Sequence, residues 1–248
     1  MHVFSLGSPF GVIPCEDLAR SHRELQHHKA GHESFKNDPI AVWGQLRGAK
    51  DLLGKSSHFY RLDHAYYKRM DFFRMTRGDF QPSKIVERPS DRWEDLKRRY
   101  SIKLSPWRYG KHVILALSDP RTYDFFGVPD FPEKTKKAIE KSTDRSVIVR
   151  KRGEKIPIGE QLKDAWCLVT YASNSVVDAL ISGVPVVTLG PSIARPVSGT
   201  IEQIEHPRYG DREPFFRHMA YCQFNRDEFR NGFALKTADE TWDLATSS

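Results

Sequence analysis

The residues with the clearest chemical potential lie at 170–187, where an expected strand gives way to a helix. Small polar side chains, Ser173, Asn174 and Ser175, stand where this helix would begin. Unpaired backbone N–H groups and the positive end of the helix dipole favour an anion at such a position. Asp178, one turn later, could accept hydrogen bonds from ribose hydroxyls. Serine and asparagine also cap helices that bind nothing, so the segment alone fits a plain helix start equally well.

An acid next to an imidazole forms the second candidate group. Asp63 and His64 follow an expected strand at 57–62. Transfer of a group to a hydroxyl needs a base for the acceptor, or a nucleophile where the configuration is retained. We expect Asp63 to fill that role, with His64 as the second choice. The alternative is an Asp63 that caps the chain or pairs with Arg61 or Arg69.

A histidine cluster near the N-terminus is a weaker candidate. His28 and His32 have the i, i+4 spacing of a helical metal site, and His22 and His27 lie nearby. A metal site would need further ligands, such as cysteine or a well-placed acid. Glu24 and Glu33 are the acids that lie near these histidines in the sequence. We therefore expect a partly helical surface arm and no metal site.

The apolar pattern predicts the elements that position these residues. From residue 111 onward, apolar runs alternate with amphipathic segments, which predicts strands at 112–117, 146–150, 166–171 and 185–189 and helices at 132–142, 158–165 and 175–182. Such alternation is typical of a parallel α/β sheet with right-handed crossovers. Ligands bind at the carboxyl ends of these strands, in the loops after 117, 150, 171 and 189. The first part is less regular, with strands expected at 40–43, 57–62 and 72–75 and helices at 47–53 and 91–100.

The run from Asn174 to Val187 resembles the donor-binding signature of glycosyltransferases of the GT-B fold. By this resemblance Asn174, Ser175 and the helix start hold a diphosphate, and Asp178, where glutamate is usual, contacts the ribose. Thr170 falls where many members have a phosphate-binding histidine. The resemblance implies a donor site made of Ser118, Arg150, Lys151, Thr170, Ser173, Asn174, Ser175, Asp178, Pro191 and Ser192.

The same resemblance implies the fold and its division. We expect an α/β, GT-B-like protein with a C-terminal Rossmann-like parallel sheet and a reduced N-terminal α/β domain. The expected boundaries are 1–110 for the acceptor side, 111–235 for the donor domain with its closing helices, and 236–248 for a tail. Residues 217–229 resemble the closing helices of phage-encoded and capsule-type glycosyltransferase-like proteins, which pack back on the first domain.

The charge of the chain is concentrated in one segment. The 248 residues carry a formal charge of +7, and residues 61–112, with 14 basic and 7 acidic side chains, hold the whole surplus. Aromatic residues interleave with these charges, which suits a polyanion with exposed bases or sugars. A solvated basic surface over an aromatic core is the alternative. We predict that the acceptor is bound by Arg61, Tyr66, Lys68, Arg69, Arg74 and Arg77.

The resemblance to GT-B enzymes implies a glycosyltransferase, a hexosyl- or pentosyltransferase, that uses a nucleotide-sugar, with a UDP-sugar favoured and no metal required. The small size and the basic acceptor side favour a hydroxymethylated pyrimidine in double-stranded phage DNA as acceptor. Two alternatives stay open: a surface polysaccharide or lipid-linked glycan as acceptor, and a non-catalytic nucleotide- or nucleic-acid-binding module. Three cysteines without a CxxC pair, and no long apolar run, favour the cytoplasm, that of the host if the protein is phage-encoded.

Overall fold

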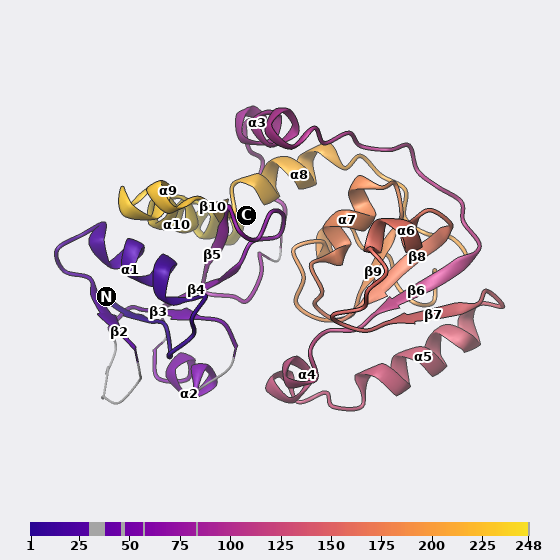
Figure 1. The fold of residues 1–248 in the computed structure, drawn as a ribbon, viewed down its shortest axis with the longest axis horizontal. Coiled ribbons are helices and arrows are strands. Elements are labelled where there is room, and N and C mark those ends of the chain that lie inside the picture. The colour runs from indigo at the N-terminus through magenta and orange to yellow at the C-terminus, as the bar shows by residue number, and fades with distance from the viewer. Residues whose placement is uncertain (30–37, 46–47, 57, 83, 248) are drawn as a thin grey trace. The chain divides into compact units, whose positions relative to one another are not determined.

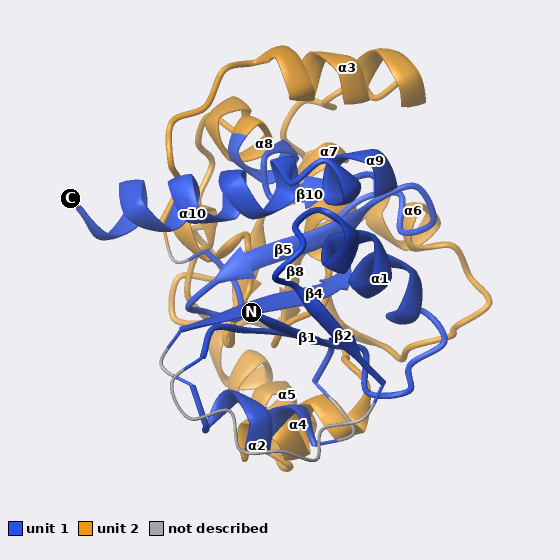
Figure 2. Ribbon diagram, turned by 90° about the vertical axis from the view of Figure 1, so that its left-hand side faces the viewer, with its two compact units in different colours: residues 1–82, 218–248 blue, residues 83–217 orange. Residues whose placement is uncertain are grey.

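The computed structural model describes residues 1–29, 38–45, 48–56, 58–82 and 84–247. The chain forms two compact units (Figure 2). Unit 1 comprises Met1–Pro82 together with His218–Ser248, and unit 2 comprises Ser83–Arg217. In the sequence, unit 2 is therefore inserted into unit 1.

Unit 1 is built on a mixed six-stranded sheet in the order β10-β5-β4-β3-β1-β2. The strands are β1 (His2–Phe4), β2 (Gln26–His28), β3 (Ile40–Trp43), β4 (Phe59–His64), β5 (Phe73–Arg77) and β10 (Gln223–Phe224). β1 to β4 are mutually parallel neighbours, whereas β5 runs antiparallel to β4 and to β10. The expected strand at 40–43 is confirmed, and every residue of β3 is buried, as an inner strand requires.

Helices cover both faces of this sheet (Figure 1). α1 (Val12–Arg20), α9 (Arg226–Arg230) and α10 (Phe233–Thr246) share one core with the strands, and α2 (Ala49–Leu53) shares another. Side chains alternate along a strand, so Val3 faces the first core and Phe4 the second. The helix expected to end at Gly54 is confirmed as α2, with Gly54 as its C-cap.

The last residues of the chain complete unit 1. β10 pairs with β5, and α10 buries Ala234, Ala238 and neighbouring threonines. Asp17 of α1, 1% exposed at its side chain, binds Arg226 at 2.7 Å and Arg230 at 2.9 Å on the α9 side. The expected return of the closing segment to the first unit is thus observed. Residues 236–248 are not a separate tail, because most of them belong to the packed helix α10.

Unit 2 contains a four-stranded parallel sheet in the order β7-β6-β8-β9. The strands are β6 (His112–Ala116), β7 (Val147–Arg150), β8 (Ala165–Thr170) and β9 (Val186–Thr188). The remaining elements of the unit are α3 (Asp91–Tyr100), α4 (Pro120–Phe126), α5 (Phe131–Ser142), α6 (Ile158–Leu162), α7 (Ser175–Ile181), the short 3-10 helix Arg195–Val197 and the start of α8 (Glu213–Ala220). The predicted parallel α/β sheet is confirmed, with each expected strand in its expected place.

The boundary between the units lies at residue 82, whereas 110 was expected. α3 packs on α8, where the rings of Trp93 and Phe216 stack with centroids 4.5 Å apart. Lys97 also reaches Glu213 at 3.6 Å. These contacts place the basic stretch 84–110 in unit 2, whereas the expected division assigned it to the first domain.

The connecting stretch before β6 is fixed by backbone hydrogen bonds. Ser105 N–H donates to Ile181 at 2.9 Å, and Arg108 N–H donates to Gly183 at 2.7 Å. Gly183 ends α7 at a φ of +76°, and a Cβ there would lie 1.9 Å from the Pro106 carbonyl oxygen. Glycine is therefore required at this helix end. None of the helices in the described part of the chain combines the length and the apolarity needed to cross a bilayer.

Candidate functional site

The four strands of unit 2 end level with one another. Leu117 N–H donates to the Arg150 carbonyl at 2.8 Å, and Leu189 N–H donates to the Thr170 carbonyl at 3.0 Å. In the order β7-β6-β8-β9, the strand that follows β6 in the chain lies on one side of β6 and β8, and the strand that follows β8 lies on the other side. The gap between these two strands is the topological switch point, where open α/β sheets bind ligands.

Polar side chains of the two loops meet this switch point. Ser118 follows β6, and its hydroxyl is buried with no hydrogen-bond partner among the described residues. Ser173 and Ser175 follow β8, and the Ser175 hydroxyl donates to Ser173 Oγ at 2.9 Å. Asn174 is the N-cap of α7 and makes no side-chain cap to the helix, while Asp178 lies half-buried in its first turn. The predicted donor residues after β6 and β8 are therefore brought to one edge.

Thr170 has a structural role, whereas the resemblance placed it where many members have a phosphate-binding histidine. Its side chain is fully buried, and its hydroxyl donates to the Ala116 carbonyl at 2.6 Å. The same oxygen accepts from Ser173 N–H at 3.3 Å. Thr170 thus joins the ends of β6 and β8 and holds the start of the polar loop.

Arg150 and Lys151, at the end of β7, differ in how their side chains are engaged. The Arg150 guanidinium donates to the Ile156 carbonyl at 2.8 Å and to Gln161 Oε1 at 2.7 Å, so it closes the loop before α6. Lys151 is exposed at the same strand end. Of this predicted pair of cations, Lys151 is the one whose side chain stands in solvent.

A charged cluster that the sequence reasoning missed lies beside them. Asp119 accepts from Arg121 at 2.8 Å and from Arg152 at 3.1 Å, and both arginines are 63% exposed at their side chains. The Arg121 hydrogen bond is the main cause that lowers the pKa of Asp119 to about 2. One ionised carboxylate therefore holds two guanidinium groups at the strand ends. The Asp119–Pro120 pair, a cap followed by proline at the first helical position, was the available signal for α4.

The loop after β9 is shaped by close packing. Gly190 lies on the ring of Tyr171, where a Cβ would come within 2.6 Å of the ring carbons. Ser192 is buried and its hydroxyl accepts from Ala194 N–H at 3.2 Å, whereas Pro191 is partly exposed. Of this predicted pair, Pro191 is therefore the residue that solvent reaches, and Ser192 stabilises the turn.

In unit 1 the candidate acid is held by an arginine. Asp63 and Arg74 are opposite residues of β4 and β5, and their side chains form an ion pair of 2.9 Å. Burial alone would raise the pKa of Asp63, but the charges of Arg74 and Arg61 outweigh it and the pKa lies below its ordinary value. We expected Arg61 or Arg69 as the alternative partner of Asp63. The ion pair forms with Arg74 instead, because the register of β5 against β4 places Arg74 opposite Asp63.

His64 lies in an aromatic setting next to Asp63. Its ring is 5.4 Å from that of Phe10 and 5.3 Å from that of Trp43, measured between centroids. Phe10 belongs to the loop between β1 and α1, which begins with Leu6 at φ 50° and Gly7 at φ 63°. Glycine adopts a positive φ without steric cost, whereas Leu6 holds a left-handed conformation that residues with a side chain rarely adopt. Phe10 of this loop thus packs edge-on against the ring of the candidate imidazole.

The predicted acceptor residues occupy three different places. Arg61 is buried, donates to the Gly44 carbonyl at 2.7 Å and stacks on Phe80. Tyr66 and Arg74 are also buried, and the Tyr66 hydroxyl donates to Gln81. Lys68 and Arg69 are exposed on the turn after β4. Arg77 forms ion pairs with Asp239 and Asp243 of α10.

The histidine cluster does not form the expected helical arm. His27 and His28 lie in β2, where His27 Nε2 is 3.0 Å from Ser5 Oγ and His28 Nε2 is 3.0 Å from His2 Nδ1. His32 falls outside the described residues. Within the residues that the structure describes, no group of three metal-ligating side chains is found.

Comparison with solved structures finds two similar chains from Thermosulfurimonas dismutans. KpsC, β-Kdo 2,7-transferase, matches with a TM-score of 0.59 and 10% identity, over 96% of this chain and 99% of that one. KpsC, β-Kdo 2,4-transferase, matches with a TM-score of 0.52 and 11% identity, over 88% of this chain and 90% of that one. No family model and no curated protein sequence matches. At these identities the likeness shows the fold, and the predicted α/β, GT-B-like architecture is confirmed.

Proposed function

We propose that this protein is a glycosyltransferase that moves a sugar from a nucleotide-sugar to a hydroxyl of a glycan. One observation carries the proposal: the residues of the donor signature gather at the topological switch point of the unit 2 sheet. The likeness in fold to the two KpsC Kdo transferase structures supports the same reaction class. The sugar and the nucleotide are left open, and a UDP-sugar remains one of the donors to test.

The donor edge offers both hydrogen-bond donors and positive charge. Ser118, Ser173, Asn174 and Ser175 supply polar groups for a diphosphate. The exposed cations Lys151, Arg121 and Arg152 stand at the ends of β6 and β7 and would stabilise the leaving diphosphate as its charge develops. With fixed guanidinium groups in this role, the proposed reaction requires no metal ion.

Asp63 is the proposed catalytic group, and His64 is the second candidate. An ion pair with Arg74 keeps the carboxylate charged at neutral pH and fixes its direction. A charged, oriented carboxylate can accept the proton of an acceptor hydroxyl, or attack the donor sugar if the configuration is retained. The proposal therefore includes both roles of Asp63, as a general base and as a nucleophile.

A glycan acceptor is favoured over hydroxymethylated DNA. The DNA hypothesis depended on one basic surface formed by residues 61–112, but this segment is divided between the two units. Several of its charges are also paired, as Arg77 is with Asp239, Lys97 with Glu94, and Arg98 and Arg99 with Asp95. Phe10, 58% exposed and in contact with His64, instead offers an aromatic face of the kind on which sugar rings stack.

The donor can be identified with a thermal-shift panel of UDP-, GDP-, CMP- and ADP-sugars. A bound ligand stabilises the folded state by mass action, so one nucleotide class should raise the melting temperature. Asn174→Ala should lose this shift, whereas Ser182→Ala at the other end of α7 should keep it. If no nucleotide-sugar stabilises the protein, and none is hydrolysed or transferred, the proposed function is wrong.

A further inference from the structure

One carboxylate at the carboxyl edge of the unit 2 sheet has all its acceptor positions filled by two arginines. Asp119 Oδ1 accepts the backbone N–H of Arg121 at 3.1 Å and its Nε at 2.9 Å. Asp119 Oδ2 accepts Arg121 Nη2 at 2.8 Å and Arg152 Nη1 at 3.1 Å. A carboxylate offers about four acceptor positions, so these four hydrogen bonds saturate it. A ligand that reaches these three residues, here called the Asp119 cluster, therefore meets them as hydrogen-bond donors.

Both guanidinium groups of the cluster keep donors for a ligand. Nη1 of Arg121, and Nε and Nη2 of Arg152, donate to no other residue within the described part of the chain. The two side chains are largely exposed, so solvent and solutes can reach these atoms. One carboxylate also leaves one of the two positive charges unbalanced. Like charges held close together repel each other, and a second anion relieves that repulsion.

The backbone on both sides of the cluster is fixed. Ser118 N–H, directly before Asp119, donates to the hydroxyl of the buried Tyr123 at 2.8 Å. Arg152 precedes Gly153, whose φ of +81° belongs to a tight turn just after β7. The two guanidinium groups are thus held together before a ligand arrives. Such preorganisation lowers the entropy cost of binding, which is otherwise high for arginine side chains.

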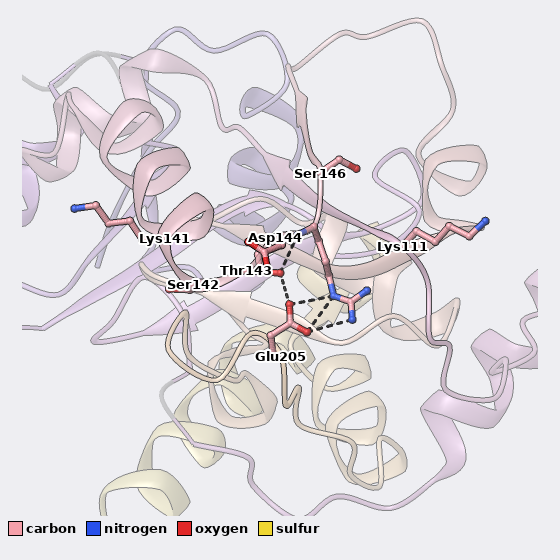
Figure 3. Close-up of a pocket in the computed structure, with 8 residues that line it drawn as sticks. Lys111, Lys141, Ser142, Thr143, Asp144, Ser146 and Glu205 are labelled. Atoms are coloured by element: carbon pink, nitrogen blue, oxygen red, sulfur yellow. Dashed lines mark hydrogen bonds and ion pairs between the residues drawn. The ribbon is translucent and has the colours of Figure 1, made fainter.

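The loops around the cluster add to its positive charge. Residues 118–126 and 150–157 contain five basic and three acidic side chains, and Lys151 and Lys155 are exposed. The amino edge of the same sheet differs, as the open hollow in Figure 3 shows. There Glu205 binds a single arginine, Arg145, at 3.1 Å. That one-to-one pair carries no net charge, in contrast to the Asp119 cluster.

We propose that the Asp119 cluster is a phosphate clamp in which Asp119 is a positioning residue. Arg121 and Arg152 donate to phosphate oxygens, and Asp119 holds the two guanidinium groups side by side so that one anion can accept from both. Guanidinium groups bind phosphate through several N–H donors at once. That this phosphate belongs to the nucleotide-sugar rests on the proposed function, because Asp119 follows β6, one of the two strands at the switch point.

The clamp and net charge alone predict opposite effects for one substitution. Asp119→Asn removes a negative charge, so net charge alone would tighten the binding of an anion. In the clamp, a neutral amide no longer holds two cations together, the arginines separate, and phosphate binding weakens. Asparagine is also a good helix N-cap, so α4 keeps its start. The sign of the change in affinity therefore distinguishes positioning from charge.

Calorimetric titration of the full-length protein with inorganic pyrophosphate at low ionic strength tests the proposal, with malonate as the carboxylate comparison. We expect saturable pyrophosphate binding that weakens with salt, and weaker binding of malonate. Asp119→Asn and Arg152→Gln should each weaken pyrophosphate binding by about tenfold, as the loss of charged hydrogen bonds does. Asp124→Asn removes the same charge from an exposed position of α4 and should leave the affinity unchanged or raise it.

A double variant separates positioning from a general loss of structure. When Arg152 is replaced by glutamine, Asp119 no longer holds two cations, so Asp119→Asn should weaken binding less in this background than in the wild type. A role of Asp119 in capping α4 alone would give the same loss in both backgrounds. Thermal melting of each variant serves as the folding control.

Three results would each overturn the clamp. They are absence of pyrophosphate binding, an Asp119→Asn variant that binds pyrophosphate as tightly as the wild type or more tightly, and malonate binding equal to that of pyrophosphate. None of these measurements needs sugar transfer. If pyrophosphate binds as expected but no nucleotide-sugar raises the melting temperature, the proposed function is contradicted and the phosphate clamp stands.

Discussion

Arg74 on β5 and Asp63 on β4 lie opposite each other, with the Arg74 Nη2 atom 2.9 Å from Asp63 Oδ2. The second carboxylate oxygen, Oδ1, accepts the His64 backbone N–H at 2.7 Å. Both oxygens are thus engaged from within unit 1, and the carboxylate has one fixed direction. This pairing explains how a partly buried acid stays charged, and it leads to the first two predictions.

Asp63→Asn should lower the rate of sugar transfer by about 10²- to 10⁴-fold, the usual contribution of a positioned base. The stabilisation by the nucleotide-sugar should be unchanged, because Asp63 and the donor residues belong to different units. Steady-state kinetics and thermal shift measure the two quantities. Asp71→Asn, at an exposed acid in the turn before β5, is the matched control and should keep full activity. Wild-type rates in Asp63→Asn would remove this residue from the mechanism.

Arg74→Gln should move the acidic limb of the pH–rate profile to higher pH. Arg74 lowers the pKa of Asp63, so its removal raises that pKa and the carboxylate becomes protonated at a higher pH. Activity that needs the ionised acid is then lost earlier as pH falls. The profile of kcat/KM reports this group in the free enzyme. An acidic limb that stays in place in Arg74→Gln would show that another group controls it.

Asp17→Asn should destabilise the protein by about 2 kcal/mol at neutral pH, the usual worth of hydrogen bonds to charged partners. Burial would raise the pKa of Asp17, but hydrogen bonds from Arg226 and Arg230 outweigh it and the pKa is lowered. A lowered pKa means that this stability is present above the unfolded value of about 3.9 and is lost as pH falls through the folded value.

Urea unfolding at several pH values measures this loss. The difference between wild type and Asp17→Asn should shrink below about pH 4. Asp227→Asn, at a carboxylate 85% exposed beside Arg230, should cost far less. A pH-independent difference would contradict the assigned ion pairs.

Gly190→Ala should destabilise unit 2 by about 1–3 kcal/mol through overpacking. The added Cβ would lie 2.6 Å from Tyr171, whose ring is held by Tyr123, Phe126 and Phe131 and has little room to move. Gly210→Ala meets open space and should be neutral. Thermal unfolding compares the two. Equal stability of both variants would mean that the loop after β9 adapts freely.

The donor half of the fold could be predicted because its signals are local. Each strand of unit 2 is a short apolar run, and the helix predicted at 91–100 matches α3. The missed features depend on distant contacts. The Asp63–Arg74 pair requires the register of β4 against β5, and the place of residues 218–248 requires the pairing of β10 with β5. The structural role of Thr170 could not be predicted either, because its hydroxyl donates a hydrogen bond to the carbonyl of Ala116, 54 residues earlier in the chain.

The return of residues 218–248 to unit 1 sets an order for folding during synthesis. Unit 2 is one continuous stretch, so it can fold as soon as residue 217 has left the ribosome. Unit 1 must wait, with the edge of β5 open, until β10 and α10 arrive. An open strand edge is a site for mispairing with other chains. The proposed catalytic acid, next to that edge on β4, is therefore assembled last.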